Sequence, residues 1–279
     1  MKKACVIGWP IKHSRSPIIH NYWLNQLGID GVYESVAVEP KNLNSFIRNL
    51  ENNGYQGCNV TLPHKEAAVA AVDAFDKVVA QTGSLNTVYL QDKKILGTST
   101  DGDGFLNNIC THYPEFNIED KTIFMIGAGG SAKAICQKLI CAKVKIIYVL
   151  NRTVERAFEL QGNYGQIIQI VQTAEQESRL KASDILINTT SQGMVGQPPL
   201  DFNIDKLPNH AIVADIVYVP LKTKLIENAQ ARNLKTVPGL GMLLHQAVEG
   251  FEKWFGVRPS VTQELYDLVQ ADIMSEYPK

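Results

Sequence analysis

Several features are missing from this sequence, and each absence excludes a class of protein. No stretch approaches the roughly 20 apolar residues that a membrane-spanning helix needs, and the apolar run at residues 4–7 is too short for a signal peptide. The net charge is -1, so no basic field would attract nucleic acid. No repeat and no low-complexity segment interrupts the chain. These absences favour a globular protein whose partners are small molecules. We expect neither nucleic acid nor a membrane as a partner.

Cysteine is scarce and follows no recognisable pattern. The five cysteines are odd in number, form no CxxC pair and show no metal-like spacing with histidine. We therefore expect no disulfide framework and no metal site, as is typical of a protein in the reducing cytoplasm. The 279 residues suit two domains of ordinary size or one large domain. The sequence leaves a monomer and a homodimer equally open.

Strand-like runs alternate with helical patterns along the chain, which is typical of α/β proteins with parallel sheets. The first such runs lie at residues 4–7, 32–38 and 57–61. Ligands bind parallel sheets at the carboxyl ends of the strands. We therefore expect a first site near Gly8 and Thr61.

The strand pattern restarts near residue 121, which indicates a second domain. We predict two α/β domains. The first has a mostly parallel sheet, covers residues 1–104 and is completed by C-terminal helices at 239–279. The second covers residues 105–238, where the alternation of strands and helices predicts a Rossmann-like domain.

A lysine directly after the third strand is the first candidate catalytic group. Asn59 and Thr61, two residues apart, point to the same face of that strand. Pro63 suits the first turn of a helix, which would place Lys65 in the same turn, where a cation opposes the helix dipole. Such an amine releases its proton more readily, which is useful for proton transfer near neutral pH. The alternative is a surface lysine that starts an ordinary helix.

Three further polar residues each have a structural and a functional interpretation. Ser16 precedes Pro17 and fits the N-cap of a helix. Ser14 has no such role, so it is either a turn residue or a hydroxyl donor to an anionic ligand. Asp101 is either an N-cap or turn aspartate, or a carboxylate that holds Lys65 in place and shares a proton with it.

A glycine-rich loop lies between a predicted strand at 121–126 and a predicted helix at 131–142. It fits the pattern G-x-G-x-x-[G/A], and its position after a strand and before a helix is the context that a dinucleotide-binding loop requires. One glycine makes the turn, the second lets the backbone approach the pyrophosphate, and the helix N-terminus offers N–H groups to the charge. The alternative is a tight turn without a ligand. The loop residues are Gly127, Ala128, Gly129, Gly130, Ser131 and Ala132.

The next predicted strand, 145–150, ends in Asn151-Arg152-Thr153, about where an NAD site carries an acidic residue for the ribose. No acid is present there. Arg152, with Arg156 four residues on, can instead neutralise a 2′-phosphate, so the sequence predicts NADP(H) as cofactor. A solvated helix start is the competing interpretation of Arg156.

The last third of the chain carries further candidates. A buried strand beginning near residue 183 ends in small polar residues that include Thr190, and Tyr218 lies just past the strand at 211–216, near where a nicotinamide ring would sit. A helix with a broad apolar stripe opens after Gly239. Met242 and Gln246, one turn apart at the edge of that stripe, could face a ligand, although a solvated glutamine is the alternative for Gln246.

Taken in order, these motifs resemble the shikimate dehydrogenase family over nearly the whole chain. The motifs are Ser14-x-Ser16, Asn59-Val-Thr61-x-Pro63-x-Lys65, Asn86-Thr87, Thr100-Asp101-Gly102, the glycine loop, Asn151-Arg152-Thr153 and Gly239-Leu-Gly241-Met242-x-x-x-Gln246. The resemblance implies NADPH-dependent reduction of 3-dehydroshikimate to shikimate in aromatic amino acid biosynthesis. It also implies a substrate-binding first domain and an NADP-binding second domain.

The resemblance implies a role for each matching residue. Lys65 and Asp101 would be the catalytic pair. Ser14 and Ser16 would hold the substrate carboxylate. Four residues would meet the substrate hydroxyls: Asn59, Thr61, Asn86 and Gln246. Tyr218, Gly239 and Met242 would line the nicotinamide side, with Tyr218 also touching substrate. Two positions depart from the family pattern, since Ser99 stands where the family usually has Asn and Lys133 where it often has Arg.

Two other functions remain open from the sequence. One is a quinate/shikimate dehydrogenase of broader specificity that accepts NAD. The other is a non-catalytic NADPH-binding sensor on the same fold. Retention of both Lys65 and Asp101 favours an enzyme over a sensor.

Overall fold

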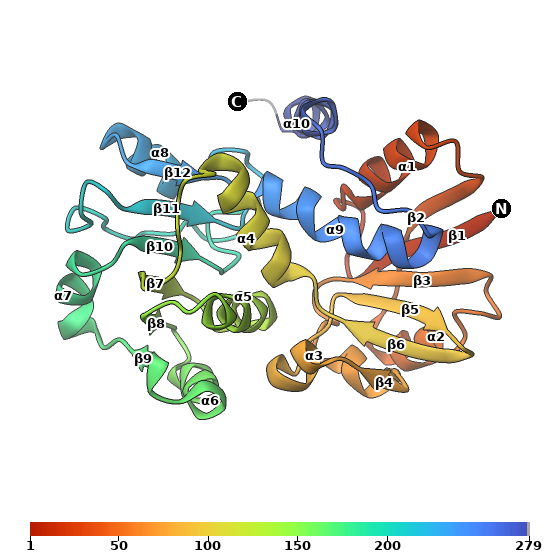
Figure 1. Cartoon of the computed structure of the whole chain (residues 1–279), viewed down its shortest axis with the longest axis horizontal. Helices are drawn as coiled ribbons and strands as arrows, with labels where there is room; N and C mark the ends of the chain where they lie inside the picture. Colours follow the sequence, from red (N-terminus) through yellow and green to blue (C-terminus); the bar gives the residue numbers. More distant parts are fainter. Residues whose placement is uncertain (278–279) are drawn as a thin grey trace. The chain divides into compact units, whose positions relative to one another are not determined.

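The computed structural model describes residues 1–277 and forms two compact units. The first unit comprises Met1–Gly104 and Leu244–Val269, and the second comprises Phe105–Leu243 and the chain from Gln270 on. Each unit holds one six-stranded sheet (Figure 1). The prediction of an α/β fold with two mostly parallel sheets is confirmed.

The first unit has the strand order β2-β1-β3-β5-β6-β4. β1 pairs in parallel with β2 and β3, β5 joins in the antiparallel sense to both β3 and β6, and β4 is parallel to β6. The bounds are β1 Lys2–Gly8, β2 Gly31–Ala37, β3 Tyr55–Val60, β4 Ala74–Phe75, β5 Thr87–Gln91 and β6 Lys94–Thr98. The hairpin between β5 and β6 turns at Asp92 and Lys93, both at positive φ.

Short helices complete the first unit. They are α1 Ser16–Gln26, the 3₁₀ turn η1 Pro40–Asn42, α2 Leu43–Arg48, η2 Ala67–Ala71 and α3 Lys77–Thr82. One apolar core joins Cys5, Cys58 and Val88 of the strands to Leu43 and Ile47 of α2.

Small residues on the sheet make room for an aromatic cluster on one face. Gly57 on β3 lies beneath the Trp254 indole, so closely that a Cβ there would come within 2.3 Å of Trp254 Nε1. The indole donates to the carbonyl of Val88 at 2.9 Å. No residue larger than glycine therefore fits at position 57 without displacing Trp254 or the sheet.

The second unit has a fully parallel sheet in the order β12-β11-β10-β7-β8-β9, as expected of a Rossmann-like domain (Figure 1). Its strands are β7 Thr122–Ile126, β8 Ile146–Leu150, β9 Ile168–Ile170, β10 Ile185–Asn188, β11 Ile212–Asp215 and β12 Lys235–Val237. Its helices are α5 Gly130–Cys141, α6 Val154–Tyr164, η3 Gly165–Ile167, η4 Thr173–Glu175, α7 Gln176–Lys181 and α8 Lys224–Ala231.

Three helices contain the boundaries between the units. They are α4 Asp101–His112, α9 Leu240–Phe255 and α10 Gln263–Glu276. The apolar stripe predicted for α9 is inside the protein, with Leu244, Ala247 and Phe251 fully buried. Among residues 1–277 no helix is long and apolar enough to cross a membrane.

Two local predictions about helix starts are wrong. Pro63 follows a cis bond and starts no α-helix, because residues 62–66 form turns before the 3₁₀ helix η2. Ser16 is the first residue of α1 rather than its N-cap, a position held by Arg15 without any side-chain cap. Lys65 therefore does not lie in the first turn of an α-helix, and the dipole of such a helix does not act on its amine. The side chains around the amine must determine its reactivity.

Candidate active site

The carboxyl ends of β1 and β3 meet at one edge of the first unit's sheet. The Thr61 amide donates to the Ile7 carbonyl at 3.0 Å, which brings the end of β3 against Gly8. A Cβ on Gly8 would come within 2.7 Å of Thr61 Cγ2, so the close approach requires glycine. The turn that follows carries Lys65, whose carbonyl accepts from the Leu85 amide at 3.0 Å. The backbone thus fixes Lys65 beside the start of β5.

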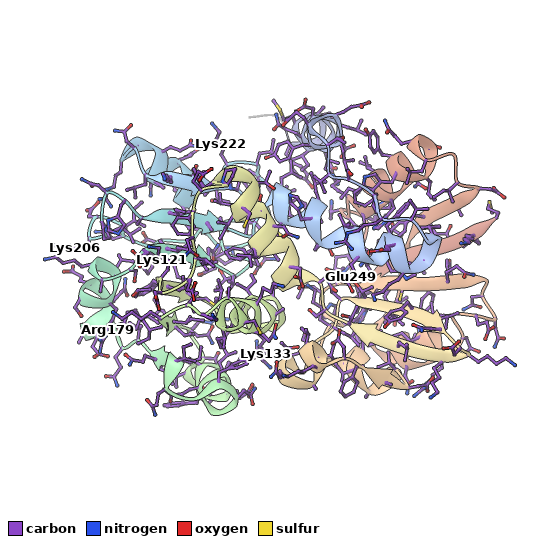
Figure 2. All side chains as sticks on the ribbon, in the orientation of Figure 1. Lys121, Lys133, Arg179, Lys206, Lys222 and Glu249 are labelled. Carbon is purple, nitrogen blue, oxygen red and sulfur yellow. The ribbon has the colours of Figure 1, made fainter. Side chains whose placement is uncertain are left out.

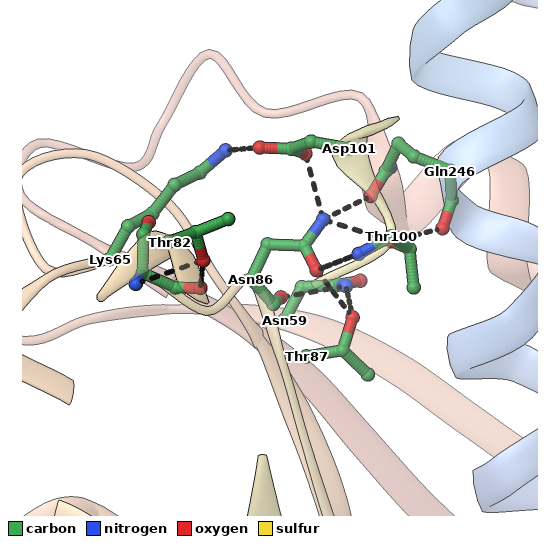
Figure 3. Close-up of polar contacts among 9 residues, drawn as sticks. Asn59, Lys65, Thr82, Asn86, Thr87, Thr100, Asp101 and Gln246 are labelled. Atoms are coloured by element: carbon green, nitrogen blue, oxygen red, sulfur yellow. Dashed lines mark hydrogen bonds and ion pairs between the residues drawn. The ribbon is translucent and has the colours of Figure 1, made fainter. Parts of the chain in front are cut away.

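Lys65 and Asp101 form an ion pair, as the functional interpretation of Asp101 predicted. The ammonium donates to Asp101 Oδ2, and the two side chains are only 15% and 6% exposed (Figure 3). Asp101 is also the first residue of α4, where the positive end of the helix dipole favours its carboxylate. The helix-start role and the pairing role are therefore compatible, and the site holds an ammonium next to an oriented carboxylate.

Asn86 connects this pair to the rest of the site. Its Nδ2 lies within hydrogen-bonding distance of Asp101 Oδ1, at 2.8 Å, and of Gln246 Oε1, at 3.2 Å (Figure 3). Its Oδ1 accepts from the Thr100 amide at 2.9 Å. Thr100 in turn donates its hydroxyl to the Gln246 carbonyl at 2.8 Å. A single buried amide therefore joins β5, the start of α4 and α9, and Gln246 is not a solvated side chain.

Asn59 is enclosed by the protein. Its Oδ1 accepts from the Tyr33 hydroxyl at 2.6 Å, and its Nδ2 is directed to the Asn86 carbonyl at 3.2 Å and Thr87 Oγ1 at 3.3 Å. Asn59 and Thr87 are paired residues on the antiparallel β3–β5 ladder, which explains their contact.

Each serine has a local contact that the sequence did not predict. Ser14 Oγ accepts from the Ser16 amide at 3.3 Å, so Ser14 has the local structural job. Ser16 is buried near the Tyr33 phenol; burial raises the pKa of that phenol, and the Ser16 side chain opposes the rise. Ser14 lies in the loop between β1 and α1, and Ser16 is the first residue of α1.

The glycine loop of the second unit has the geometry of a phosphate-binding turn. Gly127 adopts a φ of 111°, and a Cβ there would lie 2.5 Å from Thr189 Oγ1. Gly129 has open space where a Cβ would be, so a pyrophosphate can approach its backbone. Gly129 is also the N-cap of α5 and supplies no side-chain cap to the helix N–H groups. The residues present therefore fit a dinucleotide.

The predicted arginines follow β8, with Arg152 in the turn and Arg156 at the start of α6. Arg152 and Arg156 are exposed, and within residues 1–277 neither makes an ion pair. Asn151 Nδ2 donates to the Thr153 carbonyl at 2.6 Å, which shapes the turn into α6. Lys133 of α5, labelled in Figure 2, has its Nζ 3.6 Å from a carboxylate oxygen of Glu159 on α6. Arg152 and Arg156 therefore supply exposed positive charge where the sequence predicts a 2′-phosphate.

A buried polar network that the sequence did not reveal braces Thr190 and the chain before Tyr218. Asn188 Oδ1 accepts from the Thr190 hydroxyl at 2.7 Å, and its Nδ2 donates to Asp215 Oδ1 at 2.9 Å. Asp215 also accepts from the Thr223 hydroxyl and the Val217 amide. Burial raises the pKa of Asp215 to about 6, and its hydrogen bonds oppose that rise. The network fixes the carboxyl ends of β10 and β11.

Gly239 and Met242 lie at the start of α9, in the second unit. A Cβ on Gly239 would fall 2.5 Å from the Ile216 carbonyl oxygen, so glycine lets α9 start against the end of β11. Met242 is buried in the hydrophobic cluster of the same unit.

Asn108 is a buried polar residue near this helix start that the sequence did not indicate. It donates to the Pro238 carbonyl at 2.9 Å and packs against Gly241.

A parallel dinucleotide-binding sheet and a lysine–aspartate pair define a nicotinamide-dependent dehydrogenase as the class of protein. Three family models match the chain. They are the shikimate dehydrogenase substrate binding domain at residues 6–88, shikimate / quinate 5-dehydrogenase at 111–197 and the shikimate 5′-dehydrogenase C-terminal domain at 239–263. The chain belongs to the shikimate dehydrogenase family.

Individual relatives are similar over almost their full length. The shikimate dehydrogenase (NADP(+)) of Mesorhizobium japonicum is 47% identical over 273 residues, which is 98% of this chain and 97% of the relative. The structure of shikimate 5-dehydrogenase from Thermus thermophilus in complex with NADP(H) and shikimate matches with a TM-score of 0.87 at 28% identity, covering 98% and 100% of the two chains. Quinate dehydrogenase from Corynebacterium glutamicum in complex with NAD matches at 0.85 and 25% identity, covering 98% and 99%.

The unpaired charge of Arg152 gives the first prediction. Arg152→Asp should weaken NADPH binding at least about 30-fold, because a 2′-phosphate loses charge-assisted hydrogen bonds and meets a carboxylate. NADH binding should change less than about 3-fold. Fluorescence titration with each cofactor measures both constants. Lys206→Asp, at an exposed lysine of the same unit (Figure 2), makes the same change in net charge and should leave both constants near wild type. Equal losses for NADPH and NADH in Arg152→Asp would show that Arg152 is structural.

Proposed function

We propose that Lys65 and Asp101 are the catalytic pair of an NADP-dependent shikimate dehydrogenase, which reversibly reduces 3-dehydroshikimate to shikimate in aromatic amino acid biosynthesis. The observation that carries this proposal is the largely buried Lys65–Asp101 ion pair, held by Asn86 at the carboxyl edge of the sheet. NADPH, when bound, supplies the hydride. The similarity to curated NADP-dependent shikimate dehydrogenases supports this reaction.

Side chains of the first unit protonate or stabilise the oxygen of the reacting carbonyl. In the reduction this oxygen gains negative charge, and the Lys65 Nζ is the group that donates a proton to it or stabilises the charge. Asp101 accepts from Nζ through Oδ2, so it holds the ammonium in one orientation. Asn86 occupies the other carboxylate oxygen, which keeps Asp101 from turning away.

The remaining residues divide between substrate and cofactor. Ser14 and Ser16 hold the substrate carboxylate, while the substrate hydroxyls and ring meet Asn59, Thr61, Asn86, Gln246 and Tyr218. The cofactor is held by Gly127, Ala128, Gly129, Gly130, Ser131, Ala132, Asn151, Arg152, Thr153, Arg156, Thr190, Gly239 and Met242. The open backbone at Gly129 and the exposed arginines support the cofactor half of this division.

The same proposal includes the roles of the two domains, the cellular compartment and the oligomeric state. Residues 1–104 with 239–279 act as the substrate domain, and residues 105–238 bind NADP. The five cysteines are all free thiols, which supports a reducing cytoplasm as the compartment. The protein works as a monomer or a homodimer.

Oxidation of quinate with NAD is the second candidate, favoured by the likeness to a quinate dehydrogenase in complex with NAD. A spectrophotometric assay separates the two: cofactor reduction is followed by its absorbance with shikimate or quinate and with NADP or NAD. We expect the highest kcat/KM with shikimate and NADP. A preference for quinate and NAD would overturn the main assignment, and no turnover with any pair would indicate a cofactor-binding sensor.

The dyad predicts a large loss in the chemical step. Lys65→Ala and Lys65→Met should each lower kcat by roughly 10²- to 10⁴-fold while leaving NADPH affinity nearly unchanged, because the ammonium acts mainly on charge in the transition state. Asp101→Asn should act in the same direction. The double variant should lose less than the product of the two single losses, since the pair works as a unit.

Steady-state kinetics of the single and double variants tests the dyad. Lys41→Met is the matched control, because Lys41 is an exposed lysine of the same unit that is paired with Glu39. Its kcat should equal that of the wild type. Near wild-type turnover in Lys65→Ala, or losses that simply multiply, would contradict the proposed pair.

The serines should act on binding rather than chemistry. Ser14→Ala and Ser16→Ala should raise the KM for shikimate about 10-fold and change kcat less, since hydroxyl bonds to a carboxylate are present in the ground and transition states alike. Ser45→Ala, at an exposed serine of α2 in the same unit, is the control. An unchanged KM in both variants would remove the serines from the carboxylate site.

A further inference from the structure

Tyr33 lies outside every motif of the family pattern, yet it contacts the substrate site. It is on β2 and is 1% exposed, and its hydroxyl donates to Asn59 Oδ1 at 2.6 Å. The strand register explains how it reaches that far. Tyr33 is opposite Ala4 on β1, and Ala4 is opposite Gly57 on β3. Two small residues therefore leave room for the phenol ring to lie across the sheet towards Asn59.

The ring of Tyr33 is held by its surroundings. The imidazole of His20 on α1 stacks on it with ring centroids 4.0 Å apart and an interplanar angle of 14°. Burial lowers the pKa of His20 to about 3, so the stacked ring is neutral at physiological pH. Trp254 and Phe251 of α9 enclose the pair. A ring packed in this way presents its hydroxyl in one direction.

The hydroxyl of Tyr33 begins a continuous series of hydrogen bonds. Asn59 Nδ2 is within 3.3 Å of Thr87 Oγ1, and the Thr87 hydroxyl donates to Asn86 Oδ1 at 2.9 Å. Asn86 Nδ2 then donates to Asp101 Oδ1 at 2.8 Å, and Asp101 accepts from Lys65 through Oδ2 (Figure 3). Each link between Tyr33 and Asp101 both accepts and donates, so the bonds polarise one another.

We propose that Tyr33 is a positioning residue of the substrate site, whose hydroxyl fixes the amide of Asn59 and, through Thr87, that of Asn86. The number of hydrogen bonds that the Asn59 amide can form explains why its orientation matters for substrate binding. Its two N–H donors are directed to the Asn86 carbonyl and Thr87, and Tyr33 takes one lone pair of its oxygen. The second lone pair is what Asn59 can offer to a substrate hydroxyl. Without Tyr33, a buried acceptor loses its donor and the amide turns to find another.

The inference rests on the proposed function, because its readout is the KM for shikimate. Tyr33→Phe removes one oxygen atom and keeps the ring. It should raise the KM for shikimate roughly 10-fold, the size that loss of one buried hydrogen bond gives. It should change kcat less than about 3-fold and leave the KM for NADP unchanged, since Lys65 still pairs with Asp101. A purely structural role would lower the midpoint of thermal unfolding without moving the KM for one substrate alone.

Two further variants sharpen the test. Tyr55→Phe deletes the hydroxyl of another tyrosine of the same sheet, a hydroxyl that is partly buried and bonded to Glu34 instead of the site, and should leave the KM for shikimate unchanged. Thr87→Val removes the hydroxyl that joins Asn59 to Asn86. Combined with Tyr33→Phe it should raise KM by less than the product of the two single effects, because both act on Asn86.

The outcomes separate the two proposals. Wild-type protein without shikimate turnover would reject the proposed function. Active wild type with an unchanged KM in Tyr33→Phe, or with effects that multiply in the double variant, would overturn the role of Tyr33 and leave the proposed function intact. A KM effect of equal size in Tyr55→Phe would likewise overturn it.

Discussion

The pairing of Lys65 with Asp101 is the interaction on which the first unit's site depends. Two charges that are largely removed from water cost several kcal/mol each unless the structure compensates them. The compensation comes from three directions: each charge neutralises the other, the N-terminus of α4 faces the carboxylate, and Asn86 donates to its second oxygen. The site therefore requires the turn after β3, the start of β5 and the start of α4 to be correctly placed at once.

The antiparallel hairpin in an otherwise parallel sheet explains how these segments meet. β5 begins at Thr87, opposite Asn59 near the end of β3, and β6 ends at Thr98, opposite Thr87. The start of one strand and the ends of two others thus lie together. Asn86 immediately precedes β5 and Asp101 follows β6 by three residues, so chain connectivity delivers the amide and the carboxylate to the same edge. A parallel β5 would have carried Asn86 to the opposite edge.

Local patterns predicted the site where function depends on local geometry. The glycine loop needs only a strand, a turn and a helix start, and all of these are visible in consecutive residues. The same holds for the Asn151–Thr153 turn. Prediction failed at Pro63, where a rule about helix starts met a turn and a 3₁₀ helix instead. It also misplaced the structural role between Ser14 and Ser16, because a shift of one residue in a helix start decides which hydroxyl is used locally.

Residues that act through long-range pairing had no local signal. Tyr33 and Asn59 are 26 residues apart, and Asn188 and Asp215 are 27 apart. Recognising either contact requires the strand order and the register, and a one-residue slip would turn the side chains to the opposite face. In the sequence Tyr33 is one residue of the strand-like run at 32–38, and Asp215 is one residue of the strand predicted at 211–216. Only the assembled sheets show that both are hydrogen-bonded beneath the candidate residues.

The two units differ in how their polar groups meet a ligand, and this difference bears on selectivity. In the first unit the amides of Asn59 and Asn86 are buried and already bonded, so a ligand must match the few remaining positions. An analogue that lacks a matching hydroxyl leaves buried polar groups unpaired, which gives strong discrimination. In the second unit Arg152 and Arg156 are exposed. At roughly 0.1 M ionic strength, salt largely screens their attraction for a phosphate at distances beyond about 10 Å. Under the proposed function, selection of the substrate therefore depends on geometry set by folding, whereas selection of the cofactor depends on exposed charge that salt can screen.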